Sequence, residues 1–173
     1  PTPCSRRRYD VKHLLMLLIV LSMGVGPAEV AAEPPVRDHD IVPEDYFDLA
    51  SLGNLAVSPD GKTVAYTESR WGRGKEGRHT ELWTVDRQGG HPVRRTFDSF
   101  AVSAVTWAPD GSAIYFLGRD KAGRDLPPHD GSRQVWRLRP DGRDLTPVTR
   151  ATDGVGRFCL ARNGREPYYT VGS

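Results

Sequence analysis

Hydrophobic and polar positions in this chain form short alternating segments, and these segments group into a unit of four. The first unit begins with an apolar strand predicted at 54–58, which a Pro-Asp-Gly turn joins to a second strand at 63–69. Residues 81–86 alternate between polar and apolar side chains, as a half-buried strand does. A Gly-Gly hairpin turn then leads to a fourth strand at 92–97, which starts with proline.

A second unit repeats this layout. Its strands are predicted at 105–108, 113–118, 133–139 and 145–149, with Pro140-Asp141-Gly142 as the turn before the last one. Trp83 and Trp136 hold the same position in the third strand of their units. A large ring at a repeated position indicates packing between adjacent units rather than ligand stacking.

The turn between the first two strands marks the period of the repeat. Asp60 of Ser-Pro-Asp-Gly corresponds to Asp110 of Ala-Pro-Asp-Gly and to Asn163 of a degraded third copy, at spacings of 50 and 53 residues. Four strands in a repeat of this length are typical of a β-propeller blade. A β-sandwich also has short, evenly spaced strands, but it does not explain why one turn recurs with the same neighbours. We therefore predict an all-β fold, a propeller fragment of two complete four-stranded blades and part of a third over residues 54–173.

The N-terminal segment has the features of a signal peptide, predicted at residues 1–32. Three arginines at 6–8 and Lys12 precede an apolar stretch at 14–25, and small residues lead to a cleavage site after Ala32. The apolar stretch of about a dozen residues is short for a membrane span, which needs about 20. The expected location of the mature protein is therefore secreted or periplasmic, with no membrane attachment after cleavage; an uncleaved membrane anchor is the alternative.

Residues 33–53 form a lead-in to the blades. A short helix is predicted at 42–49, because proline stands in its first turn and acidic residues lie near its N-terminal end. Its apolar side chains and one just beyond it are expected to dock on the first blade; they are Tyr46, Phe47, Leu49 and Leu52.

Charge argues against nucleic acid as a partner. The whole chain has a formal net charge of +2, with 24 basic and 22 acidic residues. Beyond residue 32 the basic and acidic residues are equal in number, so the basicity belongs to the signal segment. Arginines alternate with acidic residues and glycines, as on a solvated propeller rim, and no anionic surface is expected as partner.

A search for catalytic and metal-binding motifs finds none. The chain has no Gly-x-Ser-x-Gly nucleophile elbow, no paired-cysteine zinc pattern and no His-Glu-x-x-His. Asp38-His39-Asp40 is interpreted as solvated linker, and His79, His91 and His129 have no Ser or Cys at matching repeat positions. We therefore predict no catalytic residue, no cofactor and no metal ligand in this chain. Cys159 is expected to be a buried structural thiol in a first strand.

Two longer loops stand out, at 71–79 and 120–132. Each joins the second and third strands of its blade, so both are expected on one rim, where Trp71 is the single large exposed aromatic. Loops on a rigid scaffold often bind ligands, although variable solvent-exposed loops remain the alternative.

The repeats resemble the propeller of the prolyl oligopeptidase family of serine peptidases. The similarity rests on Ser-Pro-Asp-Gly-Lys at 58–62, on Glu-Leu-Trp at 81–83, on Gly-Gly-x-Pro-Val at 89–93 and on the lead-in at 43–49, and it extends over roughly 42–170. It is nearest to secreted bacterial acylaminoacyl- and dipeptidyl-peptidase-like members.

The resemblance implies a gate for peptide substrates in front of an α/β-hydrolase domain with a Ser-Asp-His triad, which is expected beyond Ser173. No catalytic residue can be assigned here, and whether the parent protein is an enzyme depends on that domain. The Glu-Glu pair with which dipeptidyl peptidases hold the substrate amine does not occur in this chain.

A non-catalytic propeller that binds proteins, like the periplasmic TolB-type proteins, is the alternative. Those proteins carry a small α/β domain before the first blade, whereas about twenty residues separate Ala32 from the blades here.

Overall fold

A computed structural model describes residues 40–172 except 73, 75–76, 98–99 and 123. The predicted signal peptide and most of Asp38-His39-Asp40 lie outside the described residues. From Ile41 onward the chain forms one unit, which begins with the 3₁₀ helix η1 (Pro43–Asp48). The Val42 N–H donates to Asp45 Oδ2 at 3.0 Å and so satisfies a backbone donor at the start of this turn.

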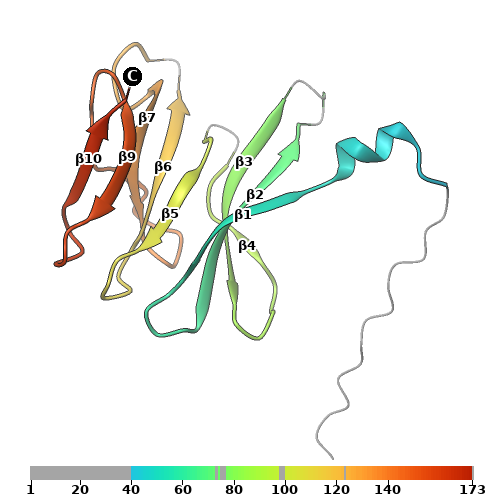
Figure 1. Ribbon diagram of the computed structural model, residues 1–173, viewed down its shortest axis with the longest axis horizontal. Helices are drawn as coiled ribbons and strands as arrows, with labels where there is room; N and C mark the ends of the chain where they lie inside the picture. Colours follow the sequence, from blue (N-terminus) through green and yellow to red (C-terminus); the bar gives the residue numbers. More distant parts are fainter. Residues whose placement is uncertain (1–39, 73, 75–76, 98–99, 123, 173) are drawn as a thin grey trace, which may run out of the picture. The chain divides into compact units, whose positions relative to one another are not determined.

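Blade 1 is a four-stranded antiparallel sheet in the order β1-β2-β3-β4 (Figure 1). Its strands are β1 (Ser51–Val57), β2 (Thr63–Trp71), β3 (Arg78–Asp86) and β4 (Val93–Arg94). The four strands are consecutive in the chain. The fourth strand is shorter than the predicted 92–97: Pro92 cannot donate a ladder hydrogen bond at its start, and beyond Arg94 the Leu82 N–H donates to the Thr96 side chain in place of a backbone carbonyl.

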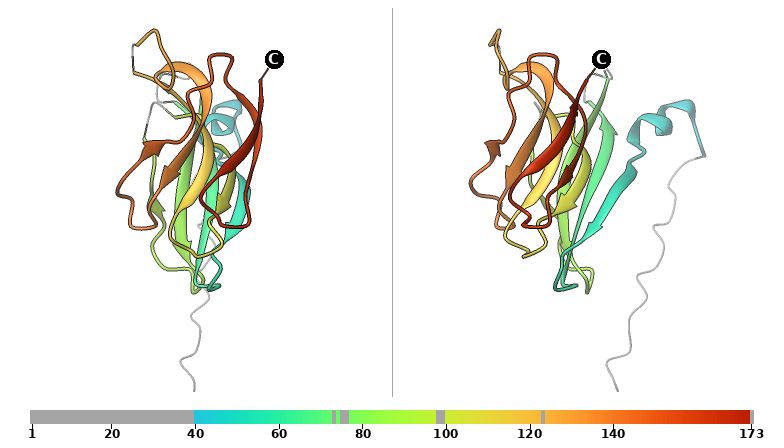
Figure 2. Two further views of the ribbon diagram at one scale, coloured as in Figure 1. Left: turned by 90° about the vertical axis from the view of Figure 1, so that its left-hand side faces the viewer. Right: turned by 60° about the vertical axis from the view of Figure 1, so that its left-hand side comes forward.

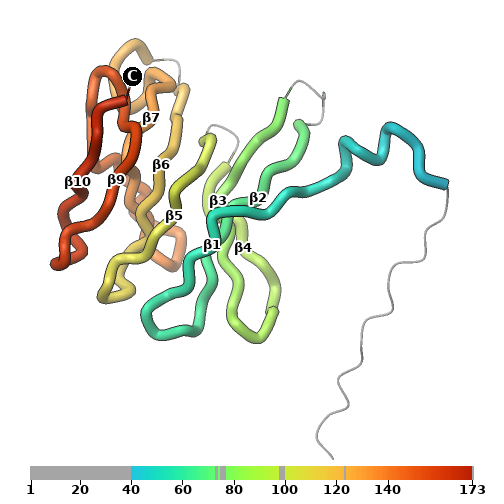
Figure 3. The backbone as a smooth tube through the Cα atoms, in the orientation of Figure 1, coloured from blue at the N-terminus to red at the C-terminus, as the bar shows by residue number. Residues whose placement is uncertain are grey.

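Blade 2 has the same topology, β5-β6-β7-β8. Its strands are β5 (Ser103–Trp107), β6 (Ile114–Lys121), β7 (Asp130–Leu138) and β8 (Thr146–Pro147). A third unit contributes a two-stranded sheet of β9 (Val155–Leu160) and β10 (Pro167–Val171). The fold is therefore the predicted all-β propeller fragment of two four-stranded blades and part of a third. The three units follow one another along the backbone trace in Figure 3.

The repeated turns have the local chemistry that the sequence predicts. In the first turn, Ser58 Oγ donates to Asp60 Oδ1 at 2.6 Å, and the Lys62 N–H donates to the same oxygen at 3.1 Å. Gly61 takes a left-handed conformation with φ of +68°, which glycine adopts without strain. The second turn matches it at Asp110 and Gly111, whose φ is +72°.

The core lies between the sheets, which stack face to face (Figure 2). Ala65 and Leu82 of blade 1 pack on Ile114, Phe116 and Trp136 of blade 2. The opposite face of blade 2 packs on the third unit through a second cluster, made of Ala108, Ala113, Tyr115, Leu117, Val135 and Val155. Trp136 is 2% exposed, so the predicted packing role between blades is confirmed for this ring.

Two predictions of burial are wrong. Cys159 is exposed, because alternation along β9 turns Phe158 and Leu160 toward blade 2 and leaves Cys159 on the other face, which no described residue covers. Leu49 is 58% exposed and does not dock on the first blade, and Leu52 lies in β1 of that blade with its side chain 66% exposed. Tyr46 and Phe47 do make ring contacts with the blade through Trp71.

Candidate functional site

The connections between second and third strands lie on one side of the molecule. The strands extend further than predicted, which shortens these connections to 72–77 in blade 1 and 122–129 in blade 2. Figure 1 shows both at the same end of the sheets, opposite the Pro-Asp-Gly turns. We call this side the loop rim.

In blade 1, the loop rim is held by aromatic packing. Trp71 is the last residue of β2, and its ring lies 6.2 Å from that of Tyr46 and 5.2 Å from that of Phe47. Arg78 donates to Ser51 Oγ at 2.9 Å and lies 6.0 Å from the Trp71 ring, which ties both ends of the connection to β1. Trp71 is therefore half-buried, and its prediction as an exposed aromatic is wrong.

In blade 2, a histidine and a carboxylate hold the loop rim. His129 Nδ1 lies 2.5 Å from Oδ2 of Asp120, which is buried at the end of β6. The His129 ring also packs edge-to-face on Trp136, with centroids 5.8 Å apart. This pair holds the two ends of the connection together beside the core of the blade. The role is structural and needs no nucleophile. The pair was not predicted from the sequence, although an acidic residue and a histidine at the two ends of a hairpin connection can indicate a contact between them.

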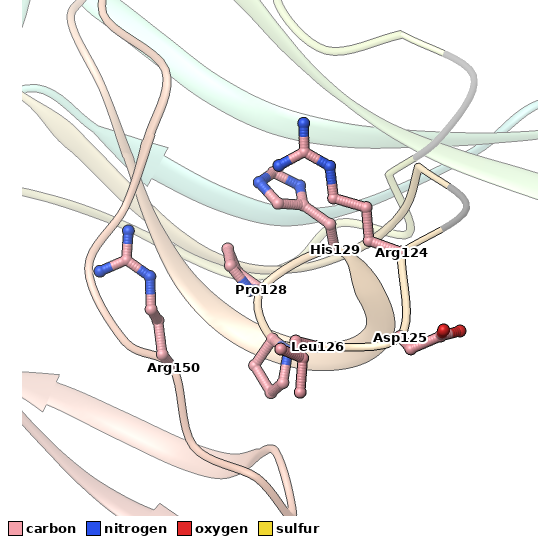
Figure 4. Close-up of a pocket in the computed structure, with 7 residues that line it drawn as sticks. Arg124, Asp125, Leu126, Pro128, His129 and Arg150 are labelled. Carbon is pink, nitrogen blue, oxygen red and sulfur yellow. The ribbon is translucent and has the colours of Figure 1, made fainter.

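A surface pocket of about 450 Å³ lies in this connection (Figure 4). Its lining residues are Arg124, Asp125, Leu126, Pro127, Pro128, His129 and Arg150. Arg124 and Arg150 lie on opposite sides of Pro128 and Leu126 in the close-up. Two guanidinium groups beside an apolar surface suit a carbonyl or carboxylate group next to an apolar side chain. A peptide has both, so this pocket has suitable chemistry for peptide contact.

The other residues considered for chemistry are dispersed. His79 and His91 are exposed, His79 in β3 and His91 after the turn that follows it. Within the described residues, no group of three His, Cys, Asp or Glu side chains could hold a metal ion. Also within that part of the chain, none of the helices has the length and apolar character to cross a membrane.

The carboxylates at the opposite side of the molecule are turn residues. The pKa of Asp60 is lowered first by the hydrogen bond from Ser58 and then by that from the Lys62 N–H. The pKa of Asp110 is lowered by the side-chain and backbone hydrogen bonds from Ser112. A lowered pKa keeps these groups ionised as acceptors that stabilise the turns, which agrees with their interpretation from the sequence.

Residues 38–141 match the sequence profile of the prolyl oligopeptidase N-terminal β-propeller domain, a match that covers more than half of the chain, all of blade 1 and the first three strands of blade 2. This chain belongs to the prolyl oligopeptidase family. It is 26% identical over 131 residues to dipeptidyl-peptidase 5 of Porphyromonas endodontalis and 25% identical over 115 residues to dipeptidyl-peptidase 5 of Porphyromonas gingivalis. These alignments cover 76% and 66% of the chain but only 18% and 17% of the two relatives.

Solved structures agree with the propeller fold. TolB from Acinetobacter baumannii superposes with a TM-score of 0.52 at 25% identity, over 68% of this chain and 26% of that one. Pyrococcus horikoshii acylaminoacyl peptidase superposes with a TM-score of 0.54 at 14% identity, over 72% of this chain and 17% of that one. Because the identity to the peptidase is 14%, the similarity to it concerns the fold alone.

Proposed function

We propose that this chain supplies the substrate-gating propeller of a secreted serine peptidase that hydrolyses short peptides. In this proposal the catalytic α/β-hydrolase domain lies elsewhere in the same protein. The observation that carries the proposal is the match of residues 38–141 to the family's propeller domain. The name of the two curated relatives, dipeptidyl-peptidase 5, supports peptides as the substrate class.

Gating follows from the way in which blades are built. Each sheet is stiffened by its ladders and packed face to face on its neighbour, so a propeller surrounds its central channel with rigid walls. An extended peptide fits such a passage, whereas a folded protein domain does not. The pocket between Arg124 and Arg150 provides polar contacts at the loop rim for a peptide that approaches from that side.

A second candidate function is a non-catalytic propeller that binds proteins. The 25% identity to Acinetobacter baumannii TolB favours it, because that protein is built from the same kind of blade. The two candidates differ in one property that can be measured directly, a reactive serine in the protein that contains this chain.

The test uses the protein expressed from its complete reading frame. We expect a fluorophosphonate probe to label one serine and to abolish hydrolysis of a dipeptidyl chromogenic substrate. A matched pair of substrates then tests the gate: one cleavable sequence is offered as a free peptide and within a folded host domain. The free peptide should be cleaved and the folded host should not.

The outcomes separate the parts of the proposal. Absence of serine labelling and of peptide hydrolysis would reject the peptidase and leave the binding propeller. Equal cleavage of the free and the folded substrate would keep the peptidase and reject the gate. Secretion is tested by N-terminal sequencing of the mature protein, which should begin at Glu33; a retained N-terminal segment would contradict it.

A further inference from the structure

The pocket that Arg124 and Arg150 line in blade 2 departs from the repeated blade in two places. The connection that carries Arg124 spans residues 122–129 and is longer than the connection at 72–77 in blade 1. Arg150 directly follows Thr149, whereas Phe97 follows the corresponding threonine of blade 1, Thr96. The propeller fold itself therefore requires neither arginine, and the pocket is open to an explanation by ligand binding.

The apolar part of the pocket is anchored to the core of blade 2. Asp120 is 7% exposed, and its Oδ2 lies 2.5 Å from Nδ1 of His129. The His129 N–H donates to the Leu126 carbonyl at 3.1 Å, which closes a turn over the two prolines. Pro127 and Pro128 restrict the backbone of this turn further, and Pro128 is buried. The surface formed by Leu126 and Pro127 is therefore held in place before a ligand arrives.

The backbone of Arg150 is anchored by the amide group of Gln134, which has no exposed surface. Gln134 Nε2 donates to the Ala151 carbonyl at 2.8 Å, and Oε1 accepts from the Ala151 N–H at 3.0 Å and from Thr149 Oγ1 at 2.8 Å. Both chain neighbours of Arg150 are thus bound to one buried group, while Arg150 itself is exposed. A backbone ordered in advance lowers the entropy lost on binding.

The positive charges of Arg124 and Arg150 are not neutralised by ion pairs. In the part of the chain that the structure describes, neither guanidinium has a carboxylate partner, in contrast to Arg94, which pairs with Glu81. Asp125 is the one acidic residue among those that line the pocket, and its side chain points away from Arg150 in Figure 4. Both arginines therefore have N–H donors available in the forked geometry that suits a carboxylate.

We propose that this pocket binds a carboxylate group of a peptide, with the neighbouring apolar side chain of that peptide on Leu126 and Pro127. The arginines supply charge-assisted hydrogen bonds, and the apolar surface adds a contact that a free inorganic anion cannot use. The volume of about 450 Å³ suits the end of a peptide or one acidic residue and its neighbour. A C-terminus and an acidic side chain share this chemistry. The inference rests on the proposed function in one point, that the ligand is a peptide.

The test measures binding, so that it does not depend on hydrolysis. The full-length protein is treated with the fluorophosphonate probe to prevent cleavage; a protein without a reactive serine gives the same measurement. Fluorescence anisotropy then compares three peptides: dansyl-Gly-Gly-Leu with a free carboxylate, its C-terminal amide, and dansyl-Gly-Glu-Leu amide. The variants are Arg124→Gln, Arg150→Gln and both together. Arg87→Gln is the matched control, because Arg87 is exposed beside the first Pro-Asp-Gly turn, where its N–H donates to the Lys62 carbonyl.

We expect at least one of the two carboxylate peptides to bind roughly tenfold or more tightly than dansyl-Gly-Gly-Leu amide, a preference kept by Arg87→Gln and lost in the double variant. Tighter binding of the free carboxylate assigns the site to a C-terminus, and tighter binding of the glutamate peptide assigns it to an acidic side chain. Equal binding of all three peptides, or a preference that survives the double substitution, would overturn the proposal. Inorganic phosphate that binds as tightly as the better peptide would also overturn it.

These outcomes are distinct from those of the proposed function. A protein without a reactive serine can still show the carboxylate preference, which would reject the peptidase and keep this site. A peptidase that hydrolyses peptides but shows no such preference would reject this site alone.

Discussion

Blades 1 and 2 have the same strand topology but differ in the polar side chain that each carries in its third strand. In both blades, a threonine that follows the fourth strand accepts a hydrogen bond from the backbone of the third strand. The Leu82 N–H donates to Thr96 Oγ1 and the Val135 N–H donates to Thr149 Oγ1, each at 2.9 Å. The residue just before that N–H differs. Blade 2 has a neutral amide, Gln134, where blade 1 has the charged Glu81.

The fourth strand explains this difference. Gln134 has no exposed surface, and its amide group makes four hydrogen bonds: Nε2 donates to Ser132 Oγ and the Ala151 carbonyl, and Oε1 accepts from Thr149 Oγ1 and the Ala151 N–H. Glu81 is also buried but pairs with Arg94 of β4, whereas blade 2 has Pro147 at that position of its fourth strand. A buried position without a cation favours a neutral group with all its hydrogen bonds made, because burying a charge costs more than burying an amide. The comparison teaches that the residue on the fourth strand determines which polar group the third strand carries.

The largest effect is expected from opening the interface between the two blades. Phe116 has no exposed surface and packs between Phe100 and the blade 1 face. Phe116→Ala should lower the free energy of unfolding by about 3–5 kcal/mol, from lost burial and the cavity left behind. The measurement is urea unfolding of the full-length protein by near-UV circular dichroism. A loss of stability within the range of surface substitutions would show that the two sheets are not packed as described.

Gln134→Glu tests the polar difference between the blades. The carboxylate loses both donated hydrogen bonds and is buried without a cation, so we expect a loss of about 3 kcal/mol at neutral pH. The matched change in blade 1, Glu81→Gln, keeps an oxygen acceptor for Arg94 and buries no unpaired charge, so it should cost less, about 1 kcal/mol. Equal costs in urea unfolding would contradict the explanation from the fourth strand.

The next prediction concerns the turns. Gly61 and Gly164 have φ of +68° and +69°, so alanine at either position pays the same cost of the left-handed conformation, about 1–2 kcal/mol. Gly164→Ala also brings its Cβ against Pro109 of the preceding blade. It should therefore lower the thermal midpoint more than Gly89→Ala does, because Gly89 has a φ of +76° but no atom within 4 Å of an added Cβ. Equal losses for the two substitutions would contradict the contact between the third turn and Pro109.

The smallest effect is a pH dependence from the turn carboxylates. Because the pKa of Asp110 is lowered in the fold, its contribution to stability is present above the unfolded-state pKa of about 4 and is lost as the pH falls through the folded-state pKa. Asp110→Asn should therefore reduce the fall in thermal midpoint between about pH 6 and about pH 3. The third turn already has Asn163 at this position, so Asn163→Asp should increase that fall. Identical pH profiles for the three proteins would contradict the assignment.

Much of the fold could be predicted because the decisive signals are local. Alternation with period two locates the strands and their faces, and Pro-Asp-Gly specifies the turns, so the observed strand bounds differ from the predicted ones mainly at the ends. The burial of Cys159 and the exposure of Trp71 were predicted wrongly for the same reason. Each depends on what a distant segment does: whether another sheet covers the face, or whether Tyr46 and Phe47 pack on the ring.

The candidate site was less accessible to sequence reasoning. The loop at 120–132 could be located from its length, but the Asp120–His129 contact and the pocket between Arg124 and Arg150 depend on how the connection folds back over Trp136. No periodicity encodes such an arrangement. The absence of catalytic residues from this chain remains a prediction.

The face-to-face packing of blade 1 on blade 2, with Trp136 buried between the sheets, is the central claim. The most direct measurement is urea unfolding of the full-length protein with Trp136→Ala. If the two sheets pack as described, this substitution should lower the free energy of unfolding by about 3–5 kcal/mol. An effect as small as that of a surface substitution, within about 0.5 kcal/mol of zero, would contradict the claim.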